Sequence, residues 1–300
     1  MATPQGGIFD EDSIHHQYLE YAVGAPDADR IVAALANACA DARGLGESSG
    51  ARVVVAFGAD LWRRIAPGTA PERLRDFEAT EGLNGTRAPA TQRDILFWIH
   101  GASVDDNLDA GLAIHRAMAG VATLELDEKG FKYHDSRDLT GFIDGTANPK
   151  VEAARAAALV ADDAPGGGGA FVLTQRWVHD LDAFAELPVT DQERVIGRTK
   201  PDSIELEGDA MPPDSHVSRT DVSSAKIYRR SAPFGSVVEK GLYFLAFACD
   251  IGRFDLLLRR MYGVADGGIR DRLTVYSRPV TGSYWFAPSE EDLNGLLKVA

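Results

Sequence analysis

The chain has few cysteines and fewer basic than acidic side chains, and each shortage excludes a class of protein. Its two cysteines, Cys39 and Cys249, lie far apart, which fits neither a disulfide framework nor a zinc site. We therefore expect buried free thiols. The 45 aspartates and glutamates outnumber the 31 lysines and arginines, giving a net charge of -14 over 300 residues. Such a charge repels nucleic-acid phosphates and anionic membranes.

Long apolar runs and recognisable metal motifs are also missing. No apolar stretch has the length of a membrane span, and the first twelve residues lack the basic and apolar regions of a signal peptide. We therefore expect a cytoplasmic protein. Neither His-Glu-x-x-His nor Cys-x-x-Cys occurs. His15 and His16 are neighbours in a predicted strand, so they point to opposite faces, and His100 and His115 lie within regular elements. A metal site built from several protein ligands is disfavoured.

Hydrophobic periodicity divides the chain into two similar series of elements. In the first half we predict strands at 16–23, 52–57, 94–100 and 121–126, and helices at 27–43 and 105–119, the first ended by Gly44 and Gly46. In the second half we predict strands at 171–178, 226–230, 241–249 and 280–286, and helices at 180–186, 191–197 and 254–262. This repeated order predicts an α+β fold of two ferredoxin-like domains, residues 1–140 and 141–300, with antiparallel sheets covered by helices.

The segment Gly141-Phe142-Ile143-Asp144-Gly145-Thr146-Ala147-Asn148-Pro149 is the first candidate for chemistry. Two glycines bracket Asp144 at positions where the backbone can turn sharply or approach a ligand closely. The residue before a proline is pushed out of the helical region, so Asn148-Pro149 closes the segment. A carboxylate could thus be fixed in a pocket. An ordinary turn, in which the acid bonds only its own backbone, explains the same residues.

A histidine and an arginine pair downstream are the other candidates. His216 follows the stiff segment Met211-Pro212-Pro213-Asp214-Ser215, and one histidine is all that a haem iron needs from a protein. An exposed loop histidine is the alternative. Arg229 and Arg230 are neighbours in a strand, so at most one of them points into a pocket, and both could instead be solvated.

Five segments, taken together, resemble the dye-decolourising peroxidases, in particular their compact bacterial type B branch. They occur in the order found in that family: Gly141 to Pro149, Ile196 to Lys200, Asp214-Ser215-His216, Arg229 with Pro233-Phe234-Gly235, and Val280-Thr281-Gly282 ahead of Phe286-Ala287-Pro288. The resemblance implies two ferredoxin-like domains and one haem b per chain, held in the C-terminal half.

The resemblance also implies a role for individual residues. His216 would be the proximal ligand of the haem iron, Asp271 would accept the proton of its imidazole, and Arg198 would meet a haem propionate. Asp144, Arg229 and Ser231 would form the catalytic distal side, with Ser231 standing where type B members often have asparagine. Further contacts to the cofactor are expected from Gly145, Thr146, Leu242 and Phe244. Leu242, Phe244 and Ala246 share one face of a strand and could form a dry wall on the distal side, although a strand in the core gives the same pattern.

By this resemblance the chain is expected to be a haem-dependent peroxidase. It would reduce hydrogen peroxide and oxidise bulky organic donors such as dyes, phenolics and porphyrinogens, one electron at a time through a ferryl intermediate. Electrons from donors too large to reach the haem would travel through surface aromatics, for which the tyrosines and Trp62, Trp98, Trp177 and Trp285 are candidates. Most of these aromatics are instead expected to be core residues. We also expect a homo-oligomer, either a dimer or a larger ring. The alternatives are a haem- or porphyrin-handling protein with incidental peroxidase activity, and a haem-free interaction protein.

Overall fold

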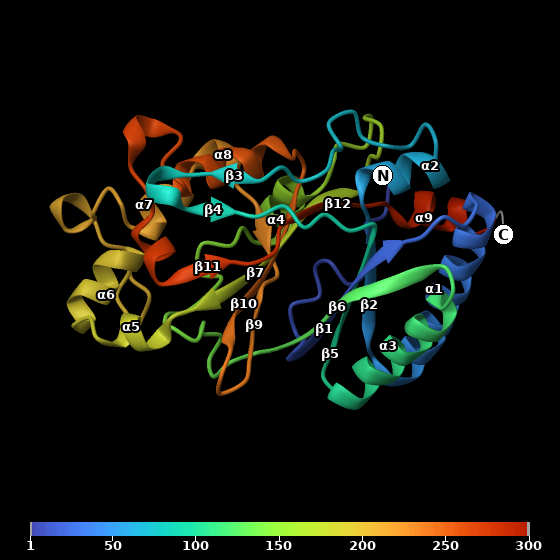
Figure 1. Cartoon of the computed structure of the whole chain (residues 1–300), viewed down its shortest axis with the longest axis horizontal. Helices are drawn as coiled ribbons and strands as arrows, with labels where there is room; N and C mark the ends of the chain where they lie inside the picture. Colours follow the sequence, from blue (N-terminus) through green and yellow to red (C-terminus); the bar gives the residue numbers. More distant parts are fainter. Residues whose placement is uncertain (1, 299–300) are drawn as a thin grey trace.

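An antiparallel sheet of ten strands runs through both halves of the chain in the computed structural model, which describes residues 2–298 (Figure 1). The strands of this sheet are β1 (His15–Val23), β2 (Arg52–Phe57), β5 (Ile95–Gly101), β6 (Ala122–Phe131), β7 (Ala170–His179), β8 (Tyr228–Arg229), β9 (Ala232–Gly235), β10 (Lys240–Ala248), β11 (Ser277–Pro279) and β12 (Ser283–Ala287). A separate ribbon joins β3 (Thr80–Glu81) to β4 (Arg87–Ala88).

Each half of the sheet has the strand order of a ferredoxin-like unit. In the first half the order is β6-β1-β5-β2, and in the second it is β12-β7-β10-β9. Numbered along the chain within its own half, each series reads fourth, first, third, second, which confirms the predicted fold class. The division of the chain at residue 140 stays a prediction.

The two units join at both edges. Phe286 of β12 pairs with Phe57 of β2, and Gly130 of β6 pairs with Phe234 of β9. Because β7 also pairs with β10, the eight strands β7-β12-β2-β5-β1-β6-β9-β10 close into a ring. Closure leaves none of these eight strands with a free edge, and it gives the sheet an inner and an outer face.

Alternating side chains fill both faces of the ring. On β1, Tyr18 points inward and Leu19 outward, and each lies in a different buried apolar cluster. Three of the four tryptophans are fully buried and Trp177 is nearly so. The expected electron carriers among the tryptophans therefore do not lie at the surface.

The helices are α1 (Ala28–Ser49), α2 (Ala59–Ile65), α3 (Val104–Met118), α4 (Val151–Ala158), α5 (Leu181–Ala185), α6 (Val189–Ile196), α7 (His216–Thr220), α8 (Gly252–Met261) and α9 (Glu290–Leu297). Most of them cover the outer face of the ring, whereas α4 packs Ala154 and Ala158 into the buried cluster that holds the inward-facing Tyr18. Figure 1 shows α1 and α3 side by side over the first half, and α5 to α8 grouped around the second.

The first helix is longer than predicted. Asp27 caps its N-terminus by accepting a hydrogen bond from the Arg30 backbone N–H at 2.9 Å. It continues through Gly44 and Gly46 and ends at Gly50, whose φ of 86° is left-handed. A Cβ at position 46 would lie 2.5 Å from the Ala51 carbonyl oxygen, so this glycine permits close packing and does not end the helix.

Several other boundaries differ from the predictions. The strand predicted at 121–126 extends to Phe131, because it pairs with β1 along its length. The strand predicted at 226–230 is reduced to the two residues of β8, and the last strand begins at Ser283. Helices α4, α7 and α9 were not predicted. Cys39 is buried, as expected, whereas Cys249 is only half-buried, and both thiols are free.

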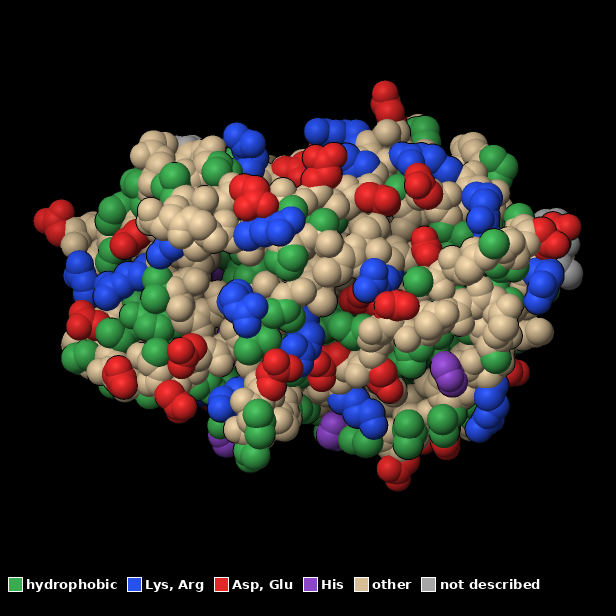
Figure 2. Space-filling model, viewed as in Figure 1, with side chains coloured by type: hydrophobic (Ala, Val, Ile, Leu, Met, Phe, Trp, Pro, Cys, Tyr) green, Lys and Arg blue, Asp and Glu red, His purple; other side chains and the backbone are tan. Residues whose placement is uncertain are grey.

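The surface carries acidic and basic side chains in a mixture. On the face shown in Figure 2, the two kinds are interspersed and do not form a large patch of one sign. Among residues 2–298, the helices are too short or too polar to cross a bilayer.

Candidate active site

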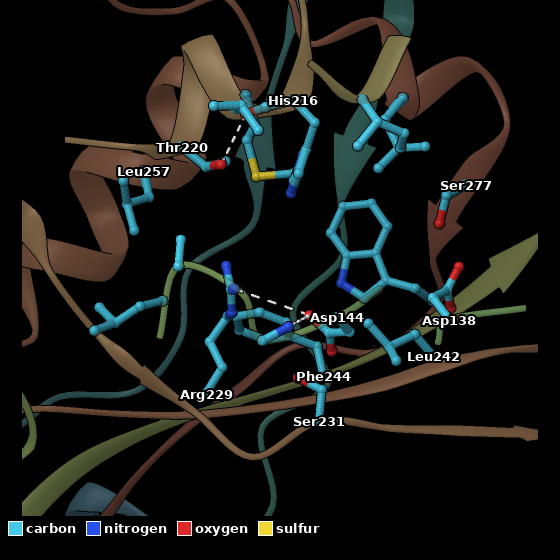
Figure 3. Close-up of a pocket in the computed structure, with 18 of the residues that line it drawn as sticks. Asp138, Asp144, His216, Thr220, Arg229, Ser231, Leu242, Phe244, Leu257 and Ser277 are labelled. Carbon is cyan, nitrogen blue, oxygen red and sulfur yellow. Dashed lines mark hydrogen bonds and ion pairs between the residues drawn. The ribbon is translucent and has the colours of Figure 1, made fainter. Parts of the chain in front are cut away.

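A cavity with largely apolar walls lies on the outer face of the second half of the sheet (Figure 3). The sheet contributes Leu173 and Trp177 from β7 and Leu242 and Phe244 from β10. Helix α8 contributes a second set of apolar side chains, namely Phe254, Leu257, Leu258 and Met261. These walls give the polar groups that reach the cavity a setting of low dielectric constant, which strengthens their electrostatic interactions.

His216 enters the cavity from the first turn of α7. The preceding proline segment is fixed to this turn, because the Ser218 hydroxyl donates to the Pro212 carbonyl at 2.8 Å. The hydroxyl of Ser215 accepts a hydrogen bond from the Ser218 N–H and caps the helix. The imidazole lines the cavity with 28% of its side chain exposed. The structure thus brings His216 to the cavity, and its role as an iron ligand stays a prediction.

Asp271 lies behind this histidine. Its carboxylate is fully buried and accepts a hydrogen bond from His216 Nδ1 at 2.7 Å. The other carboxylate oxygen accepts from the Leu273 N–H at 2.9 Å, at the start of the short 3-10 helix Arg272–Val275. With Nδ1 donating to a carboxylate, the proton sits on Nδ1 and the lone pair of Nε2 remains available to a metal.

Asp144 lies on the other side of the cavity from His216 (Figure 3). Its backbone N–H donates to the Ser136 carbonyl at 2.9 Å, and its Oδ1 accepts from the Gly145 N–H at 2.7 Å. Gly141 and Gly145 have left-handed φ values of 89° and 81°, so the segment uses both glycines for its turns. The ordinary turn and the pocket carboxylate are both present in this one segment.

Arg229 stands beside Asp144, with Nη2 3.9 Å from Asp144 Oδ1. The two neighbouring arginines point in opposite directions, and only one reaches the cavity: Arg229 lines it, whereas Arg230, just beyond the end of β8, points into the ring and lies over Trp98. Arg229 Nε is buried and has no hydrogen-bond partner among the described residues. An unpartnered buried donor of this kind indicates that the cavity accommodates a hydrogen-bond acceptor.

Asn148 connects the Asp144 segment to Arg229, a contact that the sequence analysis missed. Its side-chain amide donates to the Arg229 carbonyl at 2.8 Å and accepts from the Arg229 N–H at 2.9 Å. This pair of bonds ties the Asp144 segment to β8. The Asn-Pro dipeptide had indicated only the end of a turn, because a contact across 81 residues cannot be read from local sequence.

Arg198 and Thr146 lie at another part of the cavity wall. The Arg198 guanidinium donates to the Ser203 carbonyl at 2.9 Å and pairs with Glu205. Thr146 is connected to the same loop through a hydrogen bond of 2.8 Å between its hydroxyl and that of Ser203. The arginine is thereby fixed in place at the edge of the cavity with its charge partly balanced by Glu205.

The remaining predicted residues also reach the cavity, with one exception. Gly145, Ser231, Leu242 and Phe244 line it. The Ser231 hydroxyl accepts a hydrogen bond from the Leu245 N–H at 3.3 Å, which places it beside β10. Ala246, on the same face as Leu242, packs in the outer core instead.

A buried histidine and aspartate that the sequence analysis did not consider complete the polar wall. His179 Nε2 is 3.1 Å from Asp138 Oδ1, and its Nδ1 is 2.8 Å from the Ser277 hydroxyl. Burial opposes ionisation of Asp138, but hydrogen bonds from His179 and Thr140 outweigh it and hold the pKa of this carboxyl below its ordinary value. Strand alternation was the available signal, since Gln175, Trp177 and His179 all line the cavity.

These residues fit the haem that the resemblance implies. His216 offers a free Nε2 into an otherwise apolar space, and Arg229 offers an unpartnered donor on the other side. Arg198 provides a fixed cation at the edge, which suits a carboxylate substituent. An apolar planar ring with an iron at its centre and carboxylates at its rim would offer a partner to each of these three side chains.

Two family models together match most of the chain. The model described as "Dyp-type peroxidase, N-terminal" matches residues 5–132, and the model described as "Dyp-type peroxidase, C-terminal" matches residues 135–292. The second match contains the segments that line the cavity, from Asp138 to Ser277.

Individual relatives agree with the family models. The chain is 38% identical over 250 residues to a dye-decolorizing peroxidase of Mycobacterium tuberculosis, covering 81% of this chain and 74% of the relative. Among solved structures, it is similar to a dye-decolorizing protein from V. cholerae, with a TM-score of 0.89 and 36% identity over 98% of this chain and 99% of the other. A DypB variant of Rhodococcus jostii RHA1 in complex with heme has a TM-score of 0.87 and 35% identity, covering 94% and 95% of the two chains.

Proposed function

Because the chain belongs to the Dyp-type peroxidase family and is a haem peroxidase, we propose that it binds one haem b in this cavity and uses hydrogen peroxide to oxidise bulky organic donors. The donors would include dyes and phenolics, and porphyrinogens are a further candidate class. Each donor would lose one electron at a time.

The 2.7 Å bond between His216 Nδ1 and the buried Asp271 carboxylate is the observation that carries this proposal. The bond directs Nε2 of the imidazole to the cavity and increases its basicity as a ligand. The Asp144 and Arg229 side chains then lie on the side where peroxide would bind (Figure 3). His216 and Asp271 are therefore proposed to hold the iron, and Arg198 to hold a propionate.

A haem bound here would supply an iron that binds peroxide and accepts its oxidising equivalents. We assign the proton transfer to Asp144, whose carboxylate would take a proton from the near oxygen of hydrogen peroxide and return it to the departing oxygen. The Arg229 guanidinium would stabilise the negative charge that develops as the O–O bond breaks. Ser231 would add a hydroxyl, Gly145 and Thr146 would flank the cofactor, and Leu242 and Phe244 would exclude water.

Reconstitution with haem followed by stopped-flow mixing with peroxide tests the proposal. The expected result is a Soret band at a ratio of one haem per chain and a rapid spectral change with one equivalent of peroxide. A chain that binds haem but reacts slowly with peroxide would contradict the proposal and favour a haem-handling protein. A chain without a Soret band after reconstitution would contradict haem binding itself.

Two further predictions concern the whole protein. The cytoplasmic location stays a prediction, which fractionation of cells that express the chain would test. Self-association into a dimer or a larger ring also stays a prediction, and light scattering on the purified protein would measure the molar mass in solution.

A further inference from the structure

A buried tyrosine and glutamate, Tyr243 and Glu20, form a pair inside the ring, where the proposed reaction does not use them. Tyr243 Oη donates to Glu20 Oε1 at 2.5 Å, and the exposed fractions of the two residues are 0% and 2%. A distance of about 2.5–2.7 Å is typical of a hydroxyl bound to a charged carboxylate. Burial raises the pKa of both groups, and the hydrogen bonds that Glu20 accepts from Tyr243 and Thr174 favour its ionised form and oppose that rise.

We propose that Tyr243 is an electron relay that gives up an electron during turnover while Glu20 takes its phenolic proton. This inference rests on the proposed peroxidase function, which supplies the oxidant. It assigns Tyr243 and Glu20 a role apart from the residues that contact peroxide.

Tyr243 is adjacent to the cavity through its own strand. Its neighbours Leu242 and Phe244 line the cavity, while Tyr243 faces the interior of the ring. Only the thickness of β10 therefore separates the phenol from the space that would hold the cofactor. No other strand lies between them, since residues 242–244 are consecutive.

An irregularity in strand β1 lies next to Glu20. Strand β1 pairs with β6 in a regular register up to Glu20, and the register shifts between Glu20 and Tyr21. Such irregularities commonly redirect a side chain next to a functional site. Glu20 accepts hydrogen bonds from two hydroxyls, the Tyr243 bond and a longer one of 3.5 Å from Thr174.

A second tyrosine extends the pair. The rings of Tyr18 and Tyr243 stack with centroids 3.8 Å apart and planes inclined by 14°. The Tyr18 hydroxyl is buried and has no hydrogen-bond partner among the described residues, so Tyr18 has no base to take its proton. A radical on Tyr18 alone would therefore be less stable than one on Tyr243. The two stacked rings can share the missing electron, whereas the proton can move only from Tyr243 to Glu20.

Trp98 is a poorer site for the radical. The Arg230 guanidinium lies 5.1 Å from the centre of a Trp98 ring, and a cation there is attracted to the electrons of the ring. Loss of an electron would turn that attraction into repulsion. The electron deficiency should therefore rest on the tyrosines.

The step balances in atoms and charge. Tyr243 loses one electron, which goes to the cofactor once peroxide has oxidised it, and the O–H bond of the phenol breaks. The proton crosses the hydrogen bond to Glu20, so a neutral phenoxyl radical and a neutral carboxylic acid replace the phenol and the carboxylate. An organic donor then returns one electron, and the proton moves back to Tyr243.

A second buried pair provides a matched control. Tyr284 is 1% exposed and donates to Asp255 Oδ1 at 2.9 Å, but Asp255 also pairs with Arg75 at 2.5 Å. Because the cation already neutralises Asp255, this carboxylate is a weaker proton acceptor than Glu20. Oxidation of Tyr284 would leave its proton without a good acceptor, so we expect no radical there.

Rapid freezing of the haem-loaded protein after mixing with peroxide, followed by electron paramagnetic resonance, tests the relay. The wild type should show a tyrosyl radical. Tyr243→Phe should reduce its yield at least fivefold, and Tyr284→Phe should leave the yield unchanged. Glu20→Gln should slow radical formation and abolish its dependence on solvent deuterium, because the carboxylate no longer takes the proton.

The double variant Tyr243→Phe/Glu20→Gln guards against misfolding, since it removes the buried charge together with its partner. It should bind haem and still lack the radical. Full radical yield in this variant, or loss of the radical in Tyr284→Phe, would overturn the relay. The Soret change is recorded on the same samples: a normal change without a tyrosyl radical refutes the relay alone, and no change with peroxide refutes both the relay and the proposed function.

Discussion

Two aspartates on opposite sides of the cavity, Asp271 and Asp144, differ in burial and in how tightly they are bonded. Asp271 is fully buried and bonds His216 at 2.7 Å, with a backbone N–H on its other oxygen. Asp144 keeps 34% of its side chain exposed, and its contact with Arg229 is 3.9 Å long. The first pair is a fixed hydrogen bond, and the second is a loose contact.

This difference matches what each side would have to do. A group that orients a metal ligand performs best when its own bonds are complete and cannot rearrange. A group that moves a proton must bond its substrate during the reaction, so it needs unused hydrogen-bonding capacity before the substrate arrives. The distance of 3.9 Å and the unpartnered Arg229 Nε leave that capacity on the distal side.

Removing the imidazole should have the largest effect on haem binding. We expect His216→Ala to weaken haem binding by ~10²-fold or more, because losing a ligand costs more than losing its hydrogen-bond partner. Haem titration followed at the Soret band measures the change. His115→Ala is the control, since His115 lies on α3 away from the cavity. Unchanged haem affinity in His216→Ala would exclude His216 as the ligand.

Substitutions on the loose side should spare haem binding and slow the reaction with peroxide. Asp144→Asn should reduce the rate constant by about 10²–10⁴-fold through loss of the base, and Arg229→Leu by about 10²–10³-fold through loss of charge stabilisation. Stopped-flow traces at several peroxide concentrations give both values and show which residue limits cleavage. If either variant loses haem instead, the proposed division of labour between the two sides is wrong.

Weakening the hydrogen bond between Asp271 and His216 should give a smaller effect. Asp271→Asn leaves an amide that bonds the imidazole without a negative charge, and we expect haem affinity to fall by about 10–100-fold. The reduction potential of the iron should also rise, since a less basic ligand stabilises the ferric state less. Potentiometric titration measures it, and an unchanged potential would mean that the 2.7 Å bond only orients the ring.

A third aspartate, Asp138, also forms a buried hydrogen-bonded pair, and we expect this pair to stabilise the fold. The pKa of Asp138 lies below its ordinary value of 3.8, so its ionised form stabilises the fold above that pH. This stabilisation is lost as the pH falls through the lower pKa of the folded state. Asp138→Asn should therefore lower the free energy of unfolding by about 1–3 kcal/mol near neutrality.

Urea unfolding of both proteins between pH 3 and pH 7 measures the Asp138 effect. The difference between wild type and variant should shrink below pH 3.8. A difference that stays constant down to pH 3 would show that the charge of Asp138 does not stabilise the protein, and that its hydrogen bonds to Thr140 and His179 act without it.

Local sequence was sufficient for most elements but not for how they assemble. Strand β2 was predicted with its observed ends, because its β-branched residues and the glycine that follows are local signals. The end of α1 was missed because Gly46 looks like a helix terminator until the backbone of Ala51 is seen against it. The short β8 depends on its pairing with β10, which no local pattern encodes.

The candidate site shows the same division. Asp144, His216 and Arg229 could be selected from the sequence, since their flanking glycines and prolines and the resemblance of the segments around them identify them. Asn148 and His179 could not, because each is defined by a partner 81 or 41 residues away. Turn and strand propensities describe only neighbours along the chain.

By itself the sequence determined the two ferredoxin-like series of elements, the turns around Asp144, and the opposite directions of the neighbouring Arg229 and Arg230 side chains. These follow from local sterics and from the two-residue period of a strand. The tertiary structure alone decided the closure of the sheet into a ring, the 2.7 Å bond between His216 and Asp271, and the burial of Glu20 against Tyr243. Each of these joins residues far apart in the chain, and such contacts form only when the packing of the whole sheet brings them together.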